Sequence, residues 1–277
     1  MLTTDLIKSA LQGVPLISTI EHHASIGSTN DRARELAHAN TPEIAVISAD
    51  VQTRGRGRQN RSWFTPPGTA LAISLLTRPA IAPQHAMRLT MLAGLAAVEG
   101  IEQATGLRLD LKWPNDVVAL NNEQLTMSNV HPSSLIPHLL KVGGILTEAS
   151  FQGDAIDYAV VGLGINVNVD FSEDVELQSI ATSLKTLSGN QIDRAGVLRS
   201  IIAAFVERYS WLADGNRLRE AWAARLINLG RDIRVQFGDE VLEGRSDGVD
   251  DDGALLLRTR DGQLHRLLSG DVTLHTL

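Results

Sequence analysis

An arginine- and glycine-rich run at residues 53–63 is the part of this sequence best equipped for chemistry. Four arginines fall within eight residues of a chain whose formal net charge is -7, namely Arg54, Arg56, Arg58 and Arg61. Guanidinium groups bind the paired oxygens of carboxylates and phosphates. The glycines between the arginines let the backbone approach a ligand closely, and the amides of such loops can bind anions. The run therefore predicts a loop that grips a phosphate-bearing small molecule.

Arginine–glycine runs also occur in arms that bind nucleic acid and in solvated basic turns. Here an apolar run at 44–49 precedes the loop and another at 71–76 follows it. Such runs predict buried strands, whereas disordered arms lack order-promoting neighbours. A loop held between two buried strands is fixed in space, which favours the ligand-binding interpretation.

The overall composition excludes several classes of protein. With 277 residues, 43% of them hydrophobic and 21% charged, the chain has a globular composition and room for one large and one small domain. A pI near 5.6 argues against general binding to nucleic acid or to a membrane surface. The lack of cysteine excludes disulfides, thiolate zinc sites and a cysteine nucleophile. Because no secretory signal and no apolar run of roughly 20 residues is visible, we expect a cytoplasmic protein.

Polar groups also stand at the ends of predicted elements. Ser28 and Thr29 precede a helical pattern, where hydroxyls usually cap the helix but are also placed to bind a polar ligand. A predicted strand at 107–111 leads into the turn 112–116 (KWPND), which carries a cation, an amide and a carboxylate. Asp116 is suited to Mg²⁺, although a single aspartate at a turn more often forms an Asx turn.

Two predicted strands contain paired glycines. Lys141 opens an apolar strand at 141–148, and it is either an edge-strand lysine that discourages aggregation or a contact for an anionic intermediate. The other strand runs from Tyr158 into Gly162-x-Gly164, which superficially resembles a dinucleotide fingerprint. The third glycine is missing and no helix follows, so that interpretation fails. We expect these glycines to thin the strand so that a flat ligand can lie against it.

The remaining periodicity divides the chain into a large α/β part and a small β part. The pattern predicts helices at 83–106, 193–213 and 217–229, and loops at 121–140 and 170–190, the first partly helical near 133–140. His131 and His138 are expected to be solvated loop residues. From residue 231 onward, short β-type runs alternate with Gly-Asp and Asp-Gly turns, which predicts a small antiparallel barrel-like domain.

Several of these stretches form an ordered set of motifs. They are Gly27-Ser-Thr-Asn30, Gln52-x-x-Gly-Arg-Gly-Arg-x-x-Arg-x-Trp63, Lys112-Trp-Pro-Asn-Asp116, and Lys141-Val-Gly-Gly-Ile-Leu146 followed by Val161-Gly-Leu-Gly-Ile-Asn166. Together, from about residue 24 to 277, they resemble the bacterial biotin protein ligases. Each motif alone is modest, but all of them in this order are highly specific.

The resemblance implies a fold and a reaction. The fold is α/β, with a mixed-sheet, class II synthetase-like catalytic domain at 1–230 and a small SH3-like C-terminal β-barrel at 231–277. The reaction uses ATP, biotin and Mg²⁺ to form biotinyl-5′-AMP and pyrophosphate. The biotinyl group then passes to one lysine of a biotin carboxyl carrier domain. No protein nucleophile is needed, which agrees with the absence of cysteine.

The resemblance also assigns site residues by matching position. The biotin pocket would be lined by Ser28, Thr29, Asn30 and Gln52, with backbone contacts from Gly144, Gly162, Leu163 and Gly164. The carboxylate and phosphates would be held by Arg56, Gly57 and Arg58, with help from Arg61, and Trp63 would pack over the loop. Lys112 and Asp116 match groups near the triphosphate and Mg²⁺, while Asn115 and Asn166 match groups near the adenine. Lys141, Arg58 and Arg56 are the expected catalytic groups, and Asp116 is the expected metal ligand.

Two features depart from the family pattern. Family members with repressor activity carry an N-terminal DNA-binding module, for which residues 1–20 leave no room, so DNA binding is not expected. The link between Asp116 and Lys141 is also longer than the short turn expected. A monomer and a homodimer are both compatible with the sequence.

Other functions compete with this interpretation. A lipoyl or octanoyl ligase or transferase of related fold would share a strand lysine and a glycine-rich loop. Such enzymes lack the full arginine–glycine motif together with KWPND. A biotin-responsive regulator or an RNA-binding module is disfavoured by the acidic pI.

Overall fold

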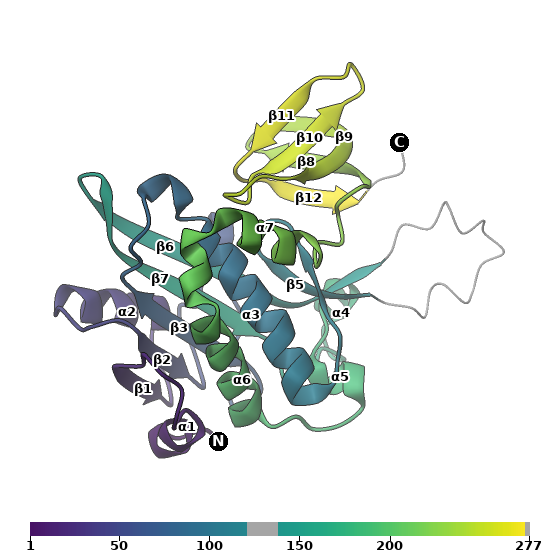
Figure 1. The fold of residues 1–277 in the computed structure, drawn as a ribbon. Helices are drawn as coiled ribbons and strands as arrows, with labels where there is room; N and C mark the ends of the chain where they lie inside the picture. Colours follow the sequence, from purple (N-terminus) through teal and green to yellow (C-terminus); the bar gives the residue numbers. More distant parts are fainter. Residues whose placement is uncertain (121–137, 275–277) are drawn as a thin grey trace.

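A seven-stranded mixed sheet forms the centre of the larger part of the molecule (Figure 1). The computed structural model describes residues 1–120 and 138–274. In spatial order the strands are β1 (Thr19–His23), β2 (Ala45–Ala49), β3 (Leu71–Thr77), β7 (Ala155–Ile165), β6 (Leu139–Gln152), β5 (Asp116–Leu120) and β4 (Asp110–Lys112). β1 and β2 are parallel and the other neighbours are antiparallel, so the expected mixed sheet is confirmed.

Side chains alternate between the two faces of this sheet. Val46 belongs to the main hydrophobic core, whereas the adjacent Ile47 belongs to a smaller cluster. The main core includes the apolar residues of α3 (Arg88–Thr105) and α6 (Arg194–Glu207), and the smaller cluster includes those of α2 (Thr29–His38). The sheet is therefore covered by α3 and α6 on one face and by α2 on the other.

The predicted helices are present, but their bounds differ. Residues Pro83–His85 form a separate 3₁₀ turn before α3, and α3 ends at Gly106, whose φ of 73° is the left-handed conformation that favours glycine. The helix expected over 193–213 is α6 followed by a 3₁₀ turn at Tyr209–Ala213. The last helix, α7, spans only Gly215–Ala223.

The prediction of a loop at 170–190 is wrong. This segment contains α4 (Val175–Ile180) and α5 (Leu184–Ser188). Asp174 caps α4 by accepting a hydrogen bond from the Leu177 amide at 3.0 Å. Because both helices span less than two turns, their apolar residues are too few to give a periodic signal. The local signals were the caps, since Ser183 also caps α5 by accepting from the Thr186 amide at 3.2 Å and Gly189 ends α5 in the left-handed conformation.

β6 is an interior strand, because it lies between β5 and β7. The interpretation of Lys141 as an edge-strand lysine is therefore wrong. The strand begins at Leu139, so the last two residues of the expected helical stretch are extended instead. The rest of that expected loop, residues 121–137 with His131, lies outside the described residues. His138 is half-buried and not the solvated residue that we expected.

The C-terminal part is a five-stranded antiparallel sheet, as the turn signals predicted. In spatial order its strands are β11 (Leu264–Leu267), β10 (Leu255–Thr259), β9 (Glu240–Val249), β8 (Asp232–Phe237) and β12 (Asp271–Leu274). In the described residues the outer strands β11 and β12 do not pair with each other. The buried Trp113 joins this sheet to the larger part, because its Nε1 donates to the Gly253 carbonyl at 2.9 Å.

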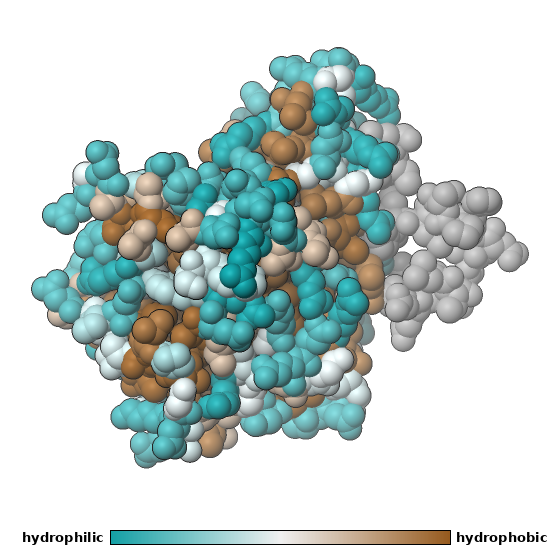
Figure 2. All heavy atoms as spheres, viewed as in Figure 1, coloured by the Kyte–Doolittle hydropathy of each residue, from teal (hydrophilic) through white to brown (hydrophobic). Residues whose placement is uncertain are grey.

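The N-terminal residues form α1 (Thr4–Ala10), which packs against β1 and α6 and buries Ile7. Across the described ranges, no helix combines the length and the apolar character needed to cross a membrane. On the face drawn in Figure 2, hydrophobic residues form separate patches among hydrophilic ones.

Candidate active site

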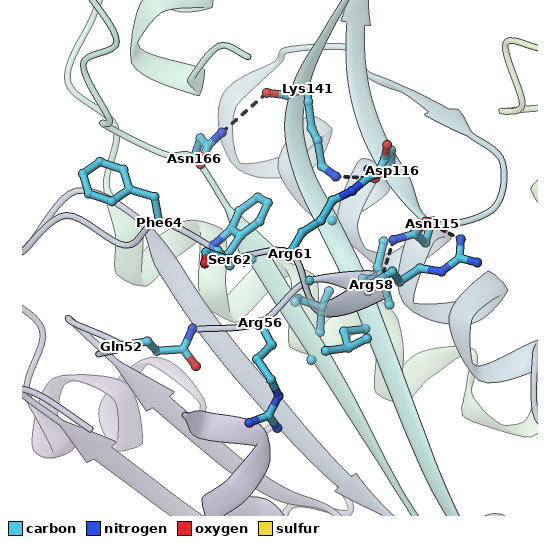
Figure 3. Close-up of a pocket in the computed structure, with 18 of the residues that line it drawn as sticks. Gln52, Arg56, Arg58, Arg61, Ser62, Phe64, Asn115, Asp116, Lys141 and Asn166 are labelled. Carbon is cyan, nitrogen blue, oxygen red and sulfur yellow. Dashed lines mark hydrogen bonds and ion pairs between the residues drawn. The ribbon is translucent and has the colours of Figure 1, made fainter. Parts of the chain in front are cut away.

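A cavity of about 300 Å³ lies between the large sheet, the start of α2, the arginine loop and α4. It brings together residues that are far apart in the sequence (Figure 3). The predicted residues in its lining are Ser28, Thr29, Asn30, Gln52, Arg56, Gly57, Arg58, Arg61, Trp63, Asn115, Asp116, Lys141, Gly144, Gly162, Leu163, Gly164 and Asn166. Of all the predicted site residues, only Lys112 is not part of this lining.

One wall of the cavity is glycine backbone. Gly164 of β7 pairs with Gly144 of β6, and Gly162 follows on the same face of β7. A Cβ atom on Gly164 would lie 2.4 Å from the Trp63 ring, and one on Gly162 would lie 2.4 Å from Asn30 Oδ1. These distances are too short for any larger residue without movement of its neighbours. The flat group that lies against the thinned strand here is the Trp63 indole.

Buried polar side chains form a hydrogen-bonded chain along the neighbouring wall. Ser74 Oγ lies 2.6 Å from Asn30 Oδ1 and 2.7 Å from Thr29 Oγ1. The Thr29 amide and hydroxyl both donate to Gln52 Oε1, at 2.9 and 3.0 Å. Ser28 occupies the N-cap position of α2, but its side chain makes no capping hydrogen bond. Ser28 therefore stands at the expected N-cap position without the expected capping hydrogen bond, and Ser28 and Thr29 both line the cavity.

A cation lies at the other end of the cavity. Lys141 Nζ is 2.6 Å from Asp116 Oδ1 and 5.7 Å from the centre of the Trp63 ring. The Lys141 and Asp116 side chains are 36% and 24% exposed, so solvent and ligands can reach both charges. Because the ammonium group is both paired and accessible, it can exchange the Asp116 carboxylate for a ligand anion.

A β-bulge aims Lys141 into the cavity. Strand alternation alone would place Lys141 and Gly144, three residues apart, on opposite faces. Val117 of β5 pairs with Gly143 of β6, whereas the next residue, Val118, pairs with Lys141. Val142 is therefore the extra residue of the bulge. Val142 is fully buried in the main core, and Lys141 Cε lies 3.3 Å from the place a Cβ on Gly144 would take. The extra residue thus turns Lys141 to the cavity face, as bulges near functional sites often do.

The arginine loop is a short hairpin. The Trp63 amide donates to the Gly55 carbonyl at 3.0 Å, and the Gly57 amide donates to the Arg61 carbonyl at 2.7 Å. A 3₁₀ turn at Arg58–Asn60 forms its tip. The loop is therefore held by its own backbone, as the buried flanking strands led us to expect.

Arg58 and Arg56 point in different directions from this hairpin. Arg58 Nη1 donates to Asn115 Oδ1 at 3.0 Å, and burial lowers the pKa of Arg58 from its usual value. A guanidinium stays protonated at neutral pH despite such a change, so Arg58 offers a partly desolvated charge. Arg56 forms an ion pair with Asp31 at 2.7 Å. Whether Arg56 also contacts a ligand stays a prediction.

Two predicted residues make contacts other than those expected. Burial lowers the pKa of Lys112, and the nearby Asp116 carboxylate opposes this effect. Lys112 therefore adds positive charge behind the cavity without lining it. Asn166 Nδ2 donates to the Thr182 carbonyl at 3.2 Å, which ties β7 to the segment between α4 and α5. The expected proximity of Asn166 to adenine stays a prediction.

Several cavity residues were missed by sequence reasoning. Phe64 of the loop and Leu177 and Ile180 of α4 form an apolar side of the cavity, and Phe64 and Ile180 are 63% and 60% exposed. Asp271 of β12 also lines the cavity, and it contacts Arg61. Exposed apolar side chains in short polar segments gave no periodic signal. The contact between Arg61 and Asp271, which joins the two parts of the molecule, had no signal in the sequence.

Comparison with known proteins decides the family. Residues 23–166 match the Biotin/lipoate A/B protein ligase family. The chain belongs to this family. Residues 229–274, which include the five-stranded sheet, match the Biotin protein ligase C terminal domain.

Individual members of the family are similar over most of their length. The bifunctional ligase/repressor BirA of Bacillus subtilis strain 168 is 36% identical over 273 residues, which cover 97% of this chain and 76% of that protein. The biotin–[acetyl-CoA-carboxylase] ligase of Paracoccus denitrificans is 32% identical over 250 residues, which cover 87% and 94%. The structure of the Aquifex aeolicus biotin protein ligase in complex with biotin and ATP is 26% identical, with a TM-score of 0.71 over 94% of this chain and 99% of that one.

Proposed function

We propose that this protein is an ATP-dependent biotin protein ligase. It activates biotin as biotinyl-5′-AMP and transfers the biotinyl group to a lysine of a carboxyl carrier domain. The observation that carries this function is the cavity itself, which joins a buried amide-and-hydroxyl wall to the cations Lys141 and Arg58. The named relatives, biotin protein ligases over most of the chain, favour biotin over lipoate or octanoate.

The activation step joins two anions. A carboxylate oxygen of biotin attacks the α-phosphorus of ATP, and pyrophosphate leaves with the bonding electron pair. Fixed positive charge and positioning are the main contributions that a protein can make to such a displacement. We assign this charge to Arg58 and Lys141, which approach the cavity from the loop and from β6. In the transfer step, the carrier lysine amine attacks the acyl carbonyl and AMP leaves.

Mg²⁺ is proposed as the partner of ATP in this site. Within residues 1–120 and 138–274 no group of three or more acidic or histidine side chains gathers as a metal cage. Mg²⁺ usually keeps several waters and takes one or two carboxylates plus substrate phosphates, so a single accessible carboxylate is a fitting donor. Asp116 is that carboxylate. Bound there with ATP, the ion would neutralise phosphate charge.

The remaining assignments are also proposals. The domains are taken as 1–230 and 231–277. Asp271 belongs to the smaller domain and lines the cavity of the larger one. Ser28, Thr29, Asn30 and Gln52 are proposed to bind biotin, because they form or adjoin the buried polar wall.

The function is tested by supplying ATP and biotin to the purified chain. We expect release of pyrophosphate only when biotin is present, and labelling of a carboxyl carrier domain on one lysine. The measurement is pyrophosphate release together with the mass of the carrier. Full replacement of biotin by lipoate or octanoate, or the absence of an adenylate, would show that the proposal is wrong.

The glycine wall gives a second prediction. We expect Gly164→Ala to weaken biotin binding by about tenfold or more, because forcing a methyl group into a packed site costs about 1–3 kcal/mol. The cause is displacement of the Trp63 ring, which lies 2.4 Å from the new atom. Titration calorimetry with biotin measures the change. Gly248→Ala is the control, because a Cβ there meets nothing within 4 Å; equal affinities in both variants would contradict the prediction.

A further inference from the structure

The arginines that line the cavity have different partners. Both terminal nitrogens of Arg56 bind Asp31, with Nη1 3.0 Å from Oδ2 and Nη2 2.7 Å from Oδ1. Arg58 makes no ion pair with a carboxylate in the part of the chain that the structure describes, and its hydrogen-bond acceptor is the neutral amide of Asn115. Figure 3 shows the Arg56 guanidinium turned away from Lys141, with Arg58 alongside Asn115. The two arginines therefore differ in their partners: a carboxylate binds Arg56, and a neutral amide binds Arg58.

A second carboxylate, that of Glu148, also lies near Arg56. Glu148 Oε1 is 3.8 Å from Arg56 Nη2, and Glu148 Oε2 accepts a hydrogen bond from Asn30 Nδ2 at 2.6 Å. Through Asn30, this carboxylate is joined to the hydrogen-bonded chain that forms the cavity wall. We call Asp31, Arg56 and Glu148 the clamp. It connects the arginine loop to α2 and to β6.

The clamp holds the loop at its base. Arg56 pairs with Ser62 across the hairpin, whereas Arg58 begins the turn at its tip. Asp31 is in the first turn of α2, directly after the wall residue Asn30. A guanidinium that binds a carboxylate through two nitrogens fixes direction as well as distance. Fixing the base of a short hairpin therefore limits where its tip can go.

The charges of the clamp are already satisfied without a ligand. Hydrogen bonds from Arg56, and next from Arg34, lower the pKa of Asp31 to about 2 despite partial burial. Asp31 is therefore ionised throughout the neutral range. The three clamp side chains are only 26–33% exposed, so solvent screens them less than it screens surface pairs. The bidentate contact uses one N–H of each terminal nitrogen of Arg56 and places a carboxylate beside its charge, so Arg56 attracts a ligand anion less than an unpaired arginine would.

We infer that Arg56 is a positioning residue, which the clamp holds against α2 and β6 so that the loop delivers Arg58 to the ligand. This inference rests on the proposed function and narrows it. Arg58 and Lys141 then supply positive charge to the reacting anions, and Arg56 positions the loop that carries Arg58. It also gives Asp31 and Glu148, which matched no expected site position, a part in the reaction.

A double-mutant cycle tests the inference. Asp31→Asn and Arg56→Gln should each speed the dissociation of biotinyl-5′-AMP by about tenfold, because each breaks the same charge-assisted hydrogen bonds. The double variant should show the same factor of about ten and not their product, because partners in one interaction are not additive. If Arg56 contacts the ligand directly, Arg56→Gln will have the much larger effect and the two effects will multiply. That result would overturn the inference.

A readout without ligand separates this test from the proposed function. Tryptic cleavage after Arg58 in the free chain should be faster in Asp31→Asn and in Glu148→Gln than in the wild type. Arg34→Gln is the matched control, because Arg34 also contacts Asp31 but is 42% exposed and does not line the cavity. Unchanged cleavage in the clamp variants would overturn the inference even if biotinyl-5′-AMP forms. Absence of biotinyl-5′-AMP in the wild type, with faster cleavage in the clamp variants, would instead overturn only the proposed function.

Discussion

Arg58→Ala is expected to slow the formation of biotinyl-5′-AMP by about a hundredfold, because removing one fixed donor from a developing charge costs about 3 kcal/mol. Arg58 lines the cavity, and burial that lowers its pKa also strengthens its interaction with a bound anion. Its acceptor in the free protein is an uncharged amide, so no protein carboxylate has to be displaced. Biotin-dependent pyrophosphate release under single-turnover conditions measures the step.

The control for this variant lies in the same loop. Arg54 is exposed and does not line the cavity, so Arg54→Ala should retain nearly all activity. The thermal unfolding midpoint of Arg58→Ala should stay close to that of the wild type. A fall in stability that matches the loss of activity would assign Arg58 a structural role and contradict the prediction.

Replacing Lys141 by methionine should have an effect at least as large. We expect a loss of about a hundredfold to a thousandfold in adenylate formation, because methionine keeps most of the length of the side chain but removes the charge at the reacting end. The ammonium group is accessible and close to both Asp116 and Trp63, at the end of the cavity that we assign to the anions. Pyrophosphate release measures this step, and transfer from supplied biotinyl-5′-AMP to a carrier domain measures the next one.

Loss of Lys141 also leaves the Asp116 carboxylate without its partner. The thermal unfolding midpoint of Lys141→Met separates this effect from a role on the ligand. If the lysine acts on the ligand, the midpoint should stay close to that of the wild type while adenylate formation falls. A fall in stability that matches the loss of activity would mean that the substitution harmed the site through the unpaired Asp116.

Much of the fold could be predicted because its signals are local. The apolar runs on either side of the arginine loop became the buried strands β2 and β3, and Gly106 ended α3 in a left-handed conformation. The glycines of β7 were expected to leave room for a flat ligand, which stays a prediction, and in the structure the side chains of Asn30 and Trp63 lie close to them. In each case the residue type itself limits the backbone or the space beside it.

The parts that could not be predicted depend on partners distant in sequence. The bulge at Val142 exists only relative to β5, so no periodicity in β6 could show that Lys141 faces the cavity. Likewise, one loop arginine cannot be distinguished from another by sequence pattern alone. Their roles separate only when Asp31 and Glu148 are seen beside Arg56.

β6 carries both Lys141 and Glu148 on one continuous strand, which pairs with β5 from Leu139 to Gly144 and with β7 from Gly143 to Gln152. Seven residue steps of extended chain span roughly 20 Å, and such a strand is hard to stretch. The strand therefore fixes the distance between Lys141, at the reacting end of the site, and Glu148, at the base of the arginine loop. Insertions in the surrounding loops can leave that spacing unchanged. A single residue inserted between Lys141 and Glu148 would turn one of these two side chains to the opposite face of the sheet.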